Sequence, residues 1–353
     1  MRADDEAATE PLVLSRKSGS VGLITLNRPR AINALNLSMV RDITNRLAEL
    51  EADSDVEVII LTGAGDRGFC AGGDMVSVCR DVQRGSPAAA ARFFEEEYAL
   101  NLQIARCAKS IVAIMDGIVL GGGVGLAGHA SHRLVTETAR VGMPEVGIGF
   151  LPDVGGTWLL SRASGELGTF VALTGMHLDA DGAIACNLAD RRIERSSIET
   201  MVARLCDGAQ INDRVGGIDS VHQDSDWSAQ RPWINRCFGH DDAATILSAL
   251  DEEADTRARE AAATIRTRSP LAVTVTLRAL RIARQLADLE SCLTLEHSAV
   301  MEFLDTPDLH EGVRAALIDK DRSPRWQPAT LEDVDPRAVD RYFARFRPAS
   351  LEP

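Results

Sequence analysis

The spacing of apolar residues separates a first half of alternating strands and helices from a mostly helical second half. Short apolar runs with many β-branched residues predict buried strands at Val21–Asn27, Val56–Thr62 and Ile111–Met115. Helices are predicted at Leu37–Leu50, where apolar positions recur at helical spacing, and at Pro87–Ala108, which is rich in Ala, Arg and Glu. The strands end near glycine or proline, so the pattern indicates an α/β core.

The second half carries helical periodicity. We predict helices at Glu166–Leu173, Asp179–Leu188, Ser197–Cys206, Ala243–Thr267, Leu271–Leu286 and Leu289–Phe303. The stretch Asp207–Arg231 is rich in Asp, Gly, Ser and Gln, which predicts a loop. The polar segment after Pro324 is expected on the surface. We therefore divide the chain into a core at 12–206, a loop-rich connection at 207–240, a helical C-terminal region at 241–330 and a surface tail at 331–353.

Composition narrows the class of protein. The formal charge of −14 argues against nucleic acid as the main partner, although a few local donors can still hold one phosphate. The seven cysteines are odd in number and form no CxxC pair, as expected of reduced thiols in a cytosolic protein. Met1–Pro11 is acidic without an apolar run, and no stretch is apolar for long enough to span a membrane. We therefore expect a cytoplasmic location and no membrane partner.

Three glycine-rich segments are candidates for chemistry. They are Gly68–Asp74 after the second strand, Gly121–Gly125 after the third, and Met143–Gly156, which contains Glu145 and Asp153. Glycine lets the backbone approach a ligand and present an N–H group, and a helix that begins there adds further donors. Two such loops can form an oxyanion hole, and nearby acidic side chains can act as bases.

A dinucleotide-binding motif is the competing interpretation of these glycines. Gly123, Gly125 and Gly128 satisfy the G-x-G-x-x-G spacing. That motif belongs directly after the first strand of a βαβ unit, whereas here it follows later strands. The acidic residue near the expected offset, Glu145, follows a proline instead of an apolar strand. We therefore disfavour dinucleotide binding.

Taken together, Leu26–Leu35 (LNRPRAINAL), Gly68–Asp74 (GFCAGGD) and Gly121–Ala127 (GGGVGLA) resemble the crotonase superfamily in order and spacing. The resemblance covers nearly the whole chain. It implies an α/β fold, a crotonase-like spiral of ββα units with a helical C-terminal region, and binding of an acyl-CoA thioester. It also implies that the backbone N–H groups of Gly73 and Gly122 form the oxyanion hole.

Within that superfamily, the acidic residues resemble those of the 3-hydroxyisobutyryl-CoA hydrolases. Enoyl-CoA hydratases use two glutamates. Glu145 matches one of them, but Gly125 occupies the position of the other. A second carboxylate is instead supplied by Asp153, eight residues after Glu145. The segments FFEEEYALN, MPEVGIGFLPDVGG and HEGVRAALIDKDRSPRWQPA are also similar to the hydrolases. The substrate contacts implied by this resemblance are Glu97, Gly122, Glu145 and Asp153.

The same acidic residues have structural interpretations that stay open at this point. Asp153 precedes a helix predicted at Val154–Arg162 and is a candidate cap for it, and Glu145 could be a charge at a helix N-terminus. Glu97 ends the acidic run Glu95–Glu97, which is typical of a solvated face.

Other reactive side chains carry weaker signals. His129 and His132 are close enough to suggest a metal, but they lack a third ligand at a sensible spacing. Cys70 lies inside an oxyanion motif without a histidine placed to activate it, so we expect a packing role. Asp116 stands where relatives often carry His, which leaves the fine substrate choice open.

The resemblance implies hydrolysis of 3-hydroxyisobutyryl-CoA to 3-hydroxyisobutyrate and CoA in valine breakdown. Glu145 would act as nucleophile or general base, while Asp153 and Glu97 would hold the substrate hydroxyl or the attacking water. We expect no metal or redox cofactor, and CoA counts as part of the substrate. Whether the protein forms a homo-oligomer stays open. Hydration or isomerisation of a short-chain acyl-CoA, and non-catalytic CoA binding, are the alternatives.

Overall fold

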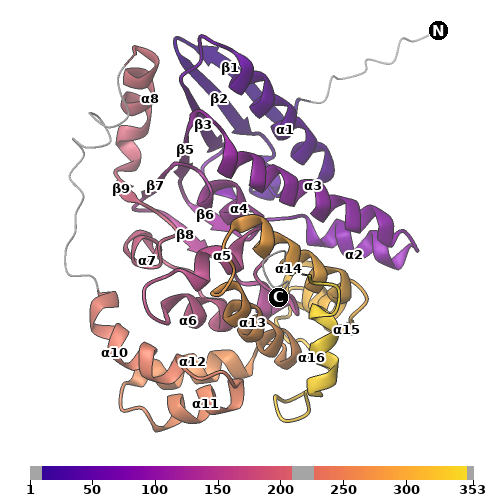
Figure 1. Cartoon of the computed structure of the whole chain (residues 1–353). Coiled ribbons are helices and arrows are strands. Elements are labelled where there is room, and N and C mark those ends of the chain that lie inside the picture. The colour runs from indigo at the N-terminus through magenta and orange to yellow at the C-terminus, as the bar shows by residue number, and fades with distance from the viewer. Residues whose placement is uncertain (1–9, 209–225, 348–353) are drawn as a thin grey trace.

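The computed structural model describes residues 10–208 and 226–347, and its N-terminal half is built on a six-stranded sheet (Figure 1). In sheet order the strands are β1 (Val13–Ser18), β2 (Val21–Leu26), β3 (Val58–Gly63), β5 (Ser110–Met115), β7 (His132–Thr136) and β9 (Arg191–Ile193). The β1 strand runs antiparallel to β2, and the remaining neighbours pair in parallel. The strands predicted from the sequence are confirmed, with small shifts at their ends.

A second, parallel sheet contains β4 (Gly68–Cys70), β6 (Ile118–Leu120) and β8 (Arg140–Gly142). Each of its strands follows one strand of the large sheet along the chain: β4 follows β3, β6 follows β5, and β8 follows β7. A helix then leads to the next pair, as α4 (Gly122–Gly128) does between β6 and β7. This repeat is the ββα spiral that the motifs predicted.

Helices cover both faces of the large sheet. On one face α8 (Ile198–Cys206) buries Met201 and Leu205 against Val21, Ile60 and Val112. On the other face lies α1 (Leu37–Ala52), whose buried residues Met39, Val40, Ile43, Leu47 and Leu50 form the predicted apolar stripe. The side chain of Asn36 accepts a hydrogen bond from the Met39 N–H and so begins this helix.

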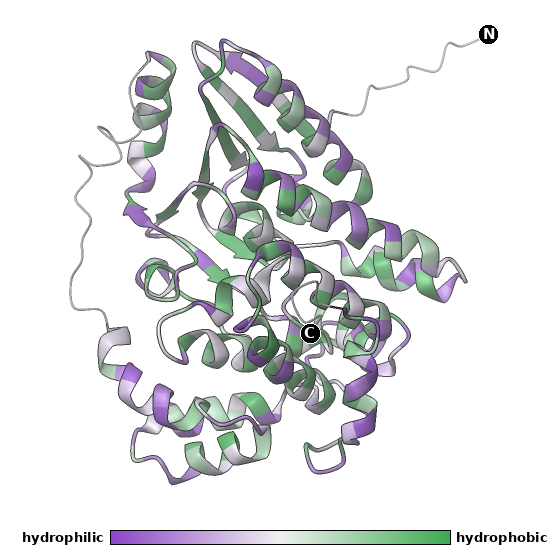
Figure 2. Cartoon of the chain, in the orientation of Figure 1, coloured by the Kyte–Doolittle hydropathy of each residue, from purple (hydrophilic) through white to green (hydrophobic). Residues whose placement is uncertain are grey.

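Further helices complete the described part of the chain, and Figure 2 shows hydrophobic and hydrophilic residues alternating along them. They are α2 (Met75–Gln83), α3 (Pro87–Arg106), α5 (Gly156–Ser161), α6 (Leu167–Thr174), α7 (Ala180–Ala185), α10 (Asp226–Phe238), α11 (Ala243–Glu252), α12 (Thr256–Arg266), α13 (Pro270–Ala283), α14 (Leu289–Phe303), α15 (Pro307–Val313) and α16 (Pro336–Phe343). One hydrophobic core joins residues from both halves of the chain. The four-part division of the chain stays a prediction.

Three expectations about the second half are wrong in part. The single helix predicted at Ala243–Thr267 is divided in two, because Glu253 is extended and Asp255 caps a new helix by accepting the Arg257 N–H. The loop predicted at Asp207–Arg231 is helical from Asp226 onward, and 209–225 lie outside the described residues. The predicted surface tail includes α16, which buries three apolar side chains beside α14: Val339, Tyr342 and Phe343.

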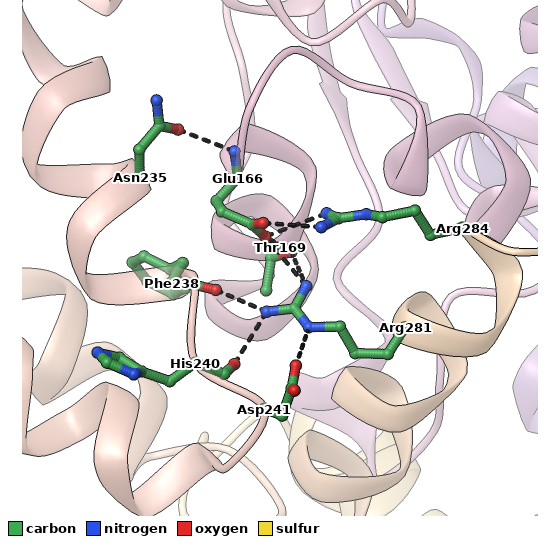
Figure 3. A network of polar contacts seen from close by, with 8 residues as sticks. All are labelled: Glu166, Thr169, Asn235, Phe238, His240, Asp241, Arg281 and Arg284. Carbon is green, nitrogen blue, oxygen red and sulfur yellow. Dashed lines mark hydrogen bonds and ion pairs between the residues drawn. The ribbon is translucent and has the colours of Figure 1, made fainter.

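A network of charged side chains joins three of these helices (Figure 3). Glu166, directly before α6, accepts hydrogen bonds from Thr169 Oγ1 at 2.6 Å, Arg281 Nη1 at 3.0 Å and Arg284 Nη1 at 2.8 Å. Arg281 on α13 also donates to the Phe238 carbonyl at the end of α10 at 2.7 Å. Because several partners share partly buried charges, this network fixes α13 against α6.

Candidate active site

A cavity of about 750 Å³ lies where the strands of the smaller sheet end. Its lining includes Gly72 and Gly73 after β4, Gly121 and Gly122 after β6, Pro144 and Glu145 after β8, Phe93, Phe94 and Glu97 from α3, Asp153, Arg268, Arg322 and Trp326. Parallel strands place their carboxyl ends at one edge of a sheet. The three glycine-rich segments that the sequence singled out therefore meet at one site.

Gly73 and Gly122 lie beside each other at this edge. A Cβ atom built on Gly122 would lie 3.3 Å from the Gly73 nitrogen and 2.5 Å from Glu97 Oε1. Among the described residues, neither of these two backbone N–H groups donates a hydrogen bond that would occupy it. Glycine is required at Gly122 because any side chain would enter the space between these groups.

Glu145 begins the short 3₁₀ helix η2 (Glu145–Ile148) and is 6% exposed. A Cβ atom on Gly121 would lie 2.8 Å from Glu145 Oε1, so the carboxyl group lies against the backbone that leads into Gly122. Its Oε2 is buried without a hydrogen-bond partner among the described residues. Burial, and then the charge of Asp153, raises the pKa of Glu145 well above its usual value.

Asp153 follows η2 and is 5% exposed. The Tyr98 hydroxyl donates a 2.7 Å hydrogen bond to Asp153 Oδ2. Burial raises the pKa of Asp153 to about 7, and the bond from Tyr98 opposes that shift. The capping role considered for Asp153 is not observed, because the N-terminus of α5 is held instead by Glu296 Oε2, which accepts the Gly155 N–H at 2.7 Å.

Glu97 lies on the buried face of α3 and is 2% exposed, whereas Glu95 in the same acidic run faces solvent. The interpretation of this run as a wholly solvated face is therefore wrong for Glu97. Its Oε1 is buried without a partner among the residues that the structure describes. Burial, and then the charge of Asp153, raises the pKa of Glu97 well above its usual value. Three carboxyl groups from separate segments thus share one poorly solvated cavity.

Gly125, the position at which hydratases carry a glutamate, is tightly packed. A Cβ atom there would lie 2.6 Å from Val154 Cβ and 3.0 Å from Asn101 Nδ2. These contacts leave no room for a longer side chain unless the loop after Asp153 moves. Val154, in the loop after Asp153, therefore occupies the space that the side chain of a hydratase glutamate would need at position 125.

The other reactive residues lie outside the cavity lining. Cys70 is buried, donates to the Asn33 carbonyl at 3.2 Å, and has its pKa raised to about 12 by burial. Asp116 accepts hydrogen bonds from Thr136 and pairs with Arg195 at 2.9 Å. Asp116 is absent from the cavity lining, and its contacts place it in this polar cluster.

His129 and His132 do not form part of a metal cluster. Within 10–208 and 226–347, no group of three or more His, Cys, Asp or Glu side chains is placed to hold a metal ion. Burial lowers the pKa of His129 to about 4, so its ring is neutral. Its Nε2 lies 2.8 Å from the Val154 carbonyl oxygen and donates to it, since a carbonyl only accepts.

The sequence did not identify Tyr98, which donates to Asp153, or Glu296, which holds the turn after Asp153. Tyr98 carried a weak signal, since it directly follows Glu97 in a segment already selected. Glu296 carried none, because its partners Gly155 and Thr157 lie 141 and 139 positions away along the chain.

Comparisons with known proteins agree with this geometry. The family profile described as Enoyl-CoA hydratase/isomerase matches residues 21–343. The chain belongs to this family. The crotonase resemblance inferred from the motifs is therefore confirmed.

Three curated relatives are named as 3-hydroxyisobutyryl-CoA hydrolases. Rat "3-hydroxyisobutyryl-CoA hydrolase, mitochondrial" is 36% identical over 97% of this chain and 91% of its own length. The human protein of that name is 35% identical over 100% of this chain and 93% of its own length. "3-hydroxyisobutyryl-CoA hydrolase 1" from Arabidopsis thaliana is 36% identical over 96% of this chain and 93% of its own length.

Solved structures of the family confirm the fold. A chain described as a carnitinyl-CoA dehydratase from Mycobacterium thermoresistibile matches with a TM-score of 0.90 and 43% identity, over 97% of this chain and 98% of its own. One described as an enoyl-CoA hydratase from Rhodobacter sphaeroides 2.4.1 has a TM-score of 0.88 and 37% identity, over 96% of this chain and 98% of its own.

The location expected from the sequence needs correction. The rat and human relatives are named as mitochondrial proteins, and this finding contradicts the cytoplasmic prediction. The prediction rested on the unpaired cysteines, on the composition of Met1–Pro11 and on the lack of a long apolar stretch. Separately, in the part of the chain that the structure describes, no helix is long and apolar enough to cross a membrane.

Proposed function

We propose that this chain is an acyl-CoA thioesterase that hydrolyses 3-hydroxyisobutyryl-CoA to 3-hydroxyisobutyrate and CoA, a step of valine breakdown. The names of the curated relatives support this substrate. The observation that carries the proposal is the position of Glu145. Its carboxyl group lies against Gly121, and the next residue along the chain, Gly122, lies beside the Gly73 nitrogen.

The thioester carbonyl oxygen would lie between the Gly73 and Gly122 N–H groups. As the carbonyl carbon is attacked, its oxygen gains negative charge, and two fixed donors in a cavity of low polarity stabilise that charge without rearranging. Neither donor is occupied within the described chain, which leaves both for the substrate. Removal of one such donor typically lowers the rate by ~10²–10³.

Glu145 would provide the attacking group by one of two routes. As a nucleophile, its carboxylate attacks the carbonyl carbon, the CoA thiolate leaves, and water then hydrolyses the resulting anhydride. As a general base, it takes a proton from a water molecule that attacks the same carbon, and the departing thiolate recovers a proton. Both routes consume one water molecule and require the ionised form of Glu145. Neither requires a metal or redox cofactor.

Asp153 and Glu97 would bind the substrate hydroxyl or the attacking water. Both carboxyl groups face the cavity, and burial brings the pKa of Asp153 to about 7, so this group can accept or donate a hydrogen bond near neutral pH. A buried polar group that finds its partner only in the bound substrate favours that substrate over analogues without the hydroxyl.

Positive charge at the cavity mouth would bind the phosphates of CoA. Arg268 is partly exposed and Arg322 is exposed, and both line the cavity of a protein whose net charge is −14. Trp326 offers an aromatic surface there, and its orientation is fixed by a 2.9 Å hydrogen bond from Nε1 to the Thr267 carbonyl. Guanidinium groups bind phosphate through paired hydrogen bonds.

A hydratase or dehydratase is the second candidate, since the two solved structures described above carry such names. The packing at Gly125 disfavours it, because the second hydratase glutamate has no space. The test is a panel of acyl-CoAs, with free thiol and loss of the enoyl absorbance measured in parallel. We expect thiol release from 3-hydroxyisobutyryl-CoA and little hydration of crotonyl-CoA. Efficient crotonyl-CoA hydration without thiol release would overturn the thioesterase.

A further inference from the structure

Glu296 is a fully buried carboxyl group on α14 whose hydrogen bonds all go to one turn beside the cavity. Its Oε2 accepts the Gly155 N–H at 2.7 Å, and its Oε1 accepts the Thr157 N–H at 2.9 Å and the Thr157 hydroxyl at 2.6 Å. Its exposed fraction is 0%, and Glu296 does not line the cavity. A carboxyl group buried at this depth is costly unless its oxygens accept hydrogen bonds, and here three donors converge on them.

The turn that Glu296 holds has an unusual backbone. Val154 has a φ of +52° and Gly155 one of +77°, so two consecutive residues are left-handed. This conformation is unfavourable for a β-branched residue and persists only when the surroundings fix it. The His129 ring donates to the Val154 carbonyl at 2.8 Å and provides a further contact that fixes the turn.

Asp153 is the residue that this turn presents to the cavity. It directly precedes Val154, and its carboxyl group reaches Tyr98 Oη at 2.7 Å. The helix that follows the turn begins at Gly156, and its N-cap residue Gly155 has no side chain with which to cap it. The N–H groups of Gly155 and Thr157 are satisfied from α14, while the Gly156 N–H donates to the Asp153 carbonyl at 2.6 Å. The backbone that carries Asp153 is therefore tied to that distant contact.

We propose that Glu296 is a positioning residue that holds the Asp153 carboxyl group toward Tyr98 and the substrate hydroxyl. This inference rests on the proposed function, in which Asp153 recognises that hydroxyl. It assigns substrate selection partly to a helix outside the cavity. A purely structural cap would stabilise the fold and leave selection unchanged, so the two roles separate experimentally.

The test compares Glu296→Gln with a matched control, Glu166→Gln. The amide keeps the size of the side chain but turns an NH₂ group toward a backbone N–H, so the turn should shift. The control weakens the network of Figure 3, where the half-buried Glu166 carboxylate lies at the start of α6, accepts from Thr169, Arg281 and Arg284, and does not line the cavity. Both variants should lower the melting temperature.

Two readouts then distinguish the variants. In crystals of Glu296→Gln the Tyr98–Asp153 hydrogen bond should be lost, and the kcat/KM preference for 3-hydroxyisobutyryl-CoA over isobutyryl-CoA should fall roughly 10-fold or more, because a small displacement of a binding group is costly. Glu166→Gln should keep both. An intact Tyr98–Asp153 bond, or an unchanged preference, in Glu296→Gln would overturn the positioning role.

A second pair of variants serves if Glu296→Gln does not fold. Thr157→Val removes one donor to Glu296, whereas Thr157→Ser keeps it. The preference should fall in the first and be retained in the second; equal values in both would overturn the proposal. Should the wild-type protein release thiol from neither ester, the proposed thioesterase fails, and the Tyr98–Asp153 distance in variant crystals still decides whether Glu296 positions Asp153.

Discussion

The Tyr98 hydroxyl donates a 2.7 Å hydrogen bond to Asp153 Oδ2 and joins α3 to the loop after η2. The neighbouring residue on α3, Glu97, faces the same cavity. One helix therefore supplies both an acid and the group that orients a second acid. Glu145 completes a set of three buried carboxyl groups, and the charge of Asp153 raises the pKa of the other two. This coupling makes the site sensitive to single substitutions.

Replacement of Glu145 by Ala should lower kcat by roughly 10²–10⁴, the range typical of a lost acid–base group. The KM for the CoA ester should change much less, because Glu145 contributes mainly to the transition state. Steady-state thiol release measures both constants, and a melting curve confirms folding. Near-normal turnover in the folded variant would reduce Glu145 to a charge at a helix N-terminus.

The pH dependence of kcat/KM should report the buried environment of Glu145. Only the ionised carboxylate acts in the proposed reaction, and its pKa is raised, so activity is present above the raised pKa and is lost as the pH falls through it. The acidic limb should thus lie well above the usual glutamate value of about 4.3.

Asp153→Asn should move that limb to lower pH, because the charge of Asp153 is the second-largest cause of the raised Glu145 pKa. The measurement is a pH profile of kcat/KM for wild type and variant, with Glu166→Gln as a control in which the limb should not move. A limb that stays in place in Asp153→Asn would show that the two carboxyl groups do not interact as the structure indicates.

Gly122→Ala should damage catalysis through crowding. The added Cβ would lie 2.5 Å from Glu97 Oε1 and 3.2 Å from Leu35 Cδ1, so either the loop or the Glu97 carboxyl group must move. Displacing an oxyanion donor should lower kcat by about 10²–10³. Gly239→Ala is the control, since its nearest contact is the Asn235 carbonyl at 3.0 Å, outside the cavity lining. Equal kcat values for these two variants would contradict an oxyanion role for Gly122.

The sequence could predict that the glycine-rich segments meet, because each of them is local and follows a strand. Gly73, Gly122 and Glu145 each follow a strand, and parallel strands bring such positions to one edge. The break inside the predicted helix Ala243–Thr267 was missed because the helix-forming residues on both sides outweighed the capping signal of Asp255.

Contacts between distant segments could not be predicted in this way. The bonds from Gly155 and Thr157 to Glu296 join positions 141 and 139 residues apart, and no spacing rule connects them. The left-handed backbone of Val154 was equally hidden, because a β-branched residue gives no signal for it. For the same reason the sequence suggested an Asp153 side-chain cap for a helix at whose start the Glu296 carboxyl group accepts the Gly155 and Thr157 N–H groups.

The substrate hydroxyl should matter through Asp153. Isobutyryl-CoA, which lacks only that hydroxyl, should be cleaved much more slowly than the hydroxy ester, because it leaves buried carboxyl groups without a partner. Asp153→Ala should narrow the difference in kcat/KM between the two esters, since the unpaired carboxylate disappears with the side chain. The structure adds a second expectation: Asp153 caps no helix, so the variant should not lose the ~0.5–2 kcal/mol of unfolding free energy that a lost cap costs. Kinetics on both esters and urea unfolding of both proteins provide the measurements. A lower stability with an unchanged preference would return Asp153 to a capping role and leave Glu97 as the remaining candidate for the hydroxyl.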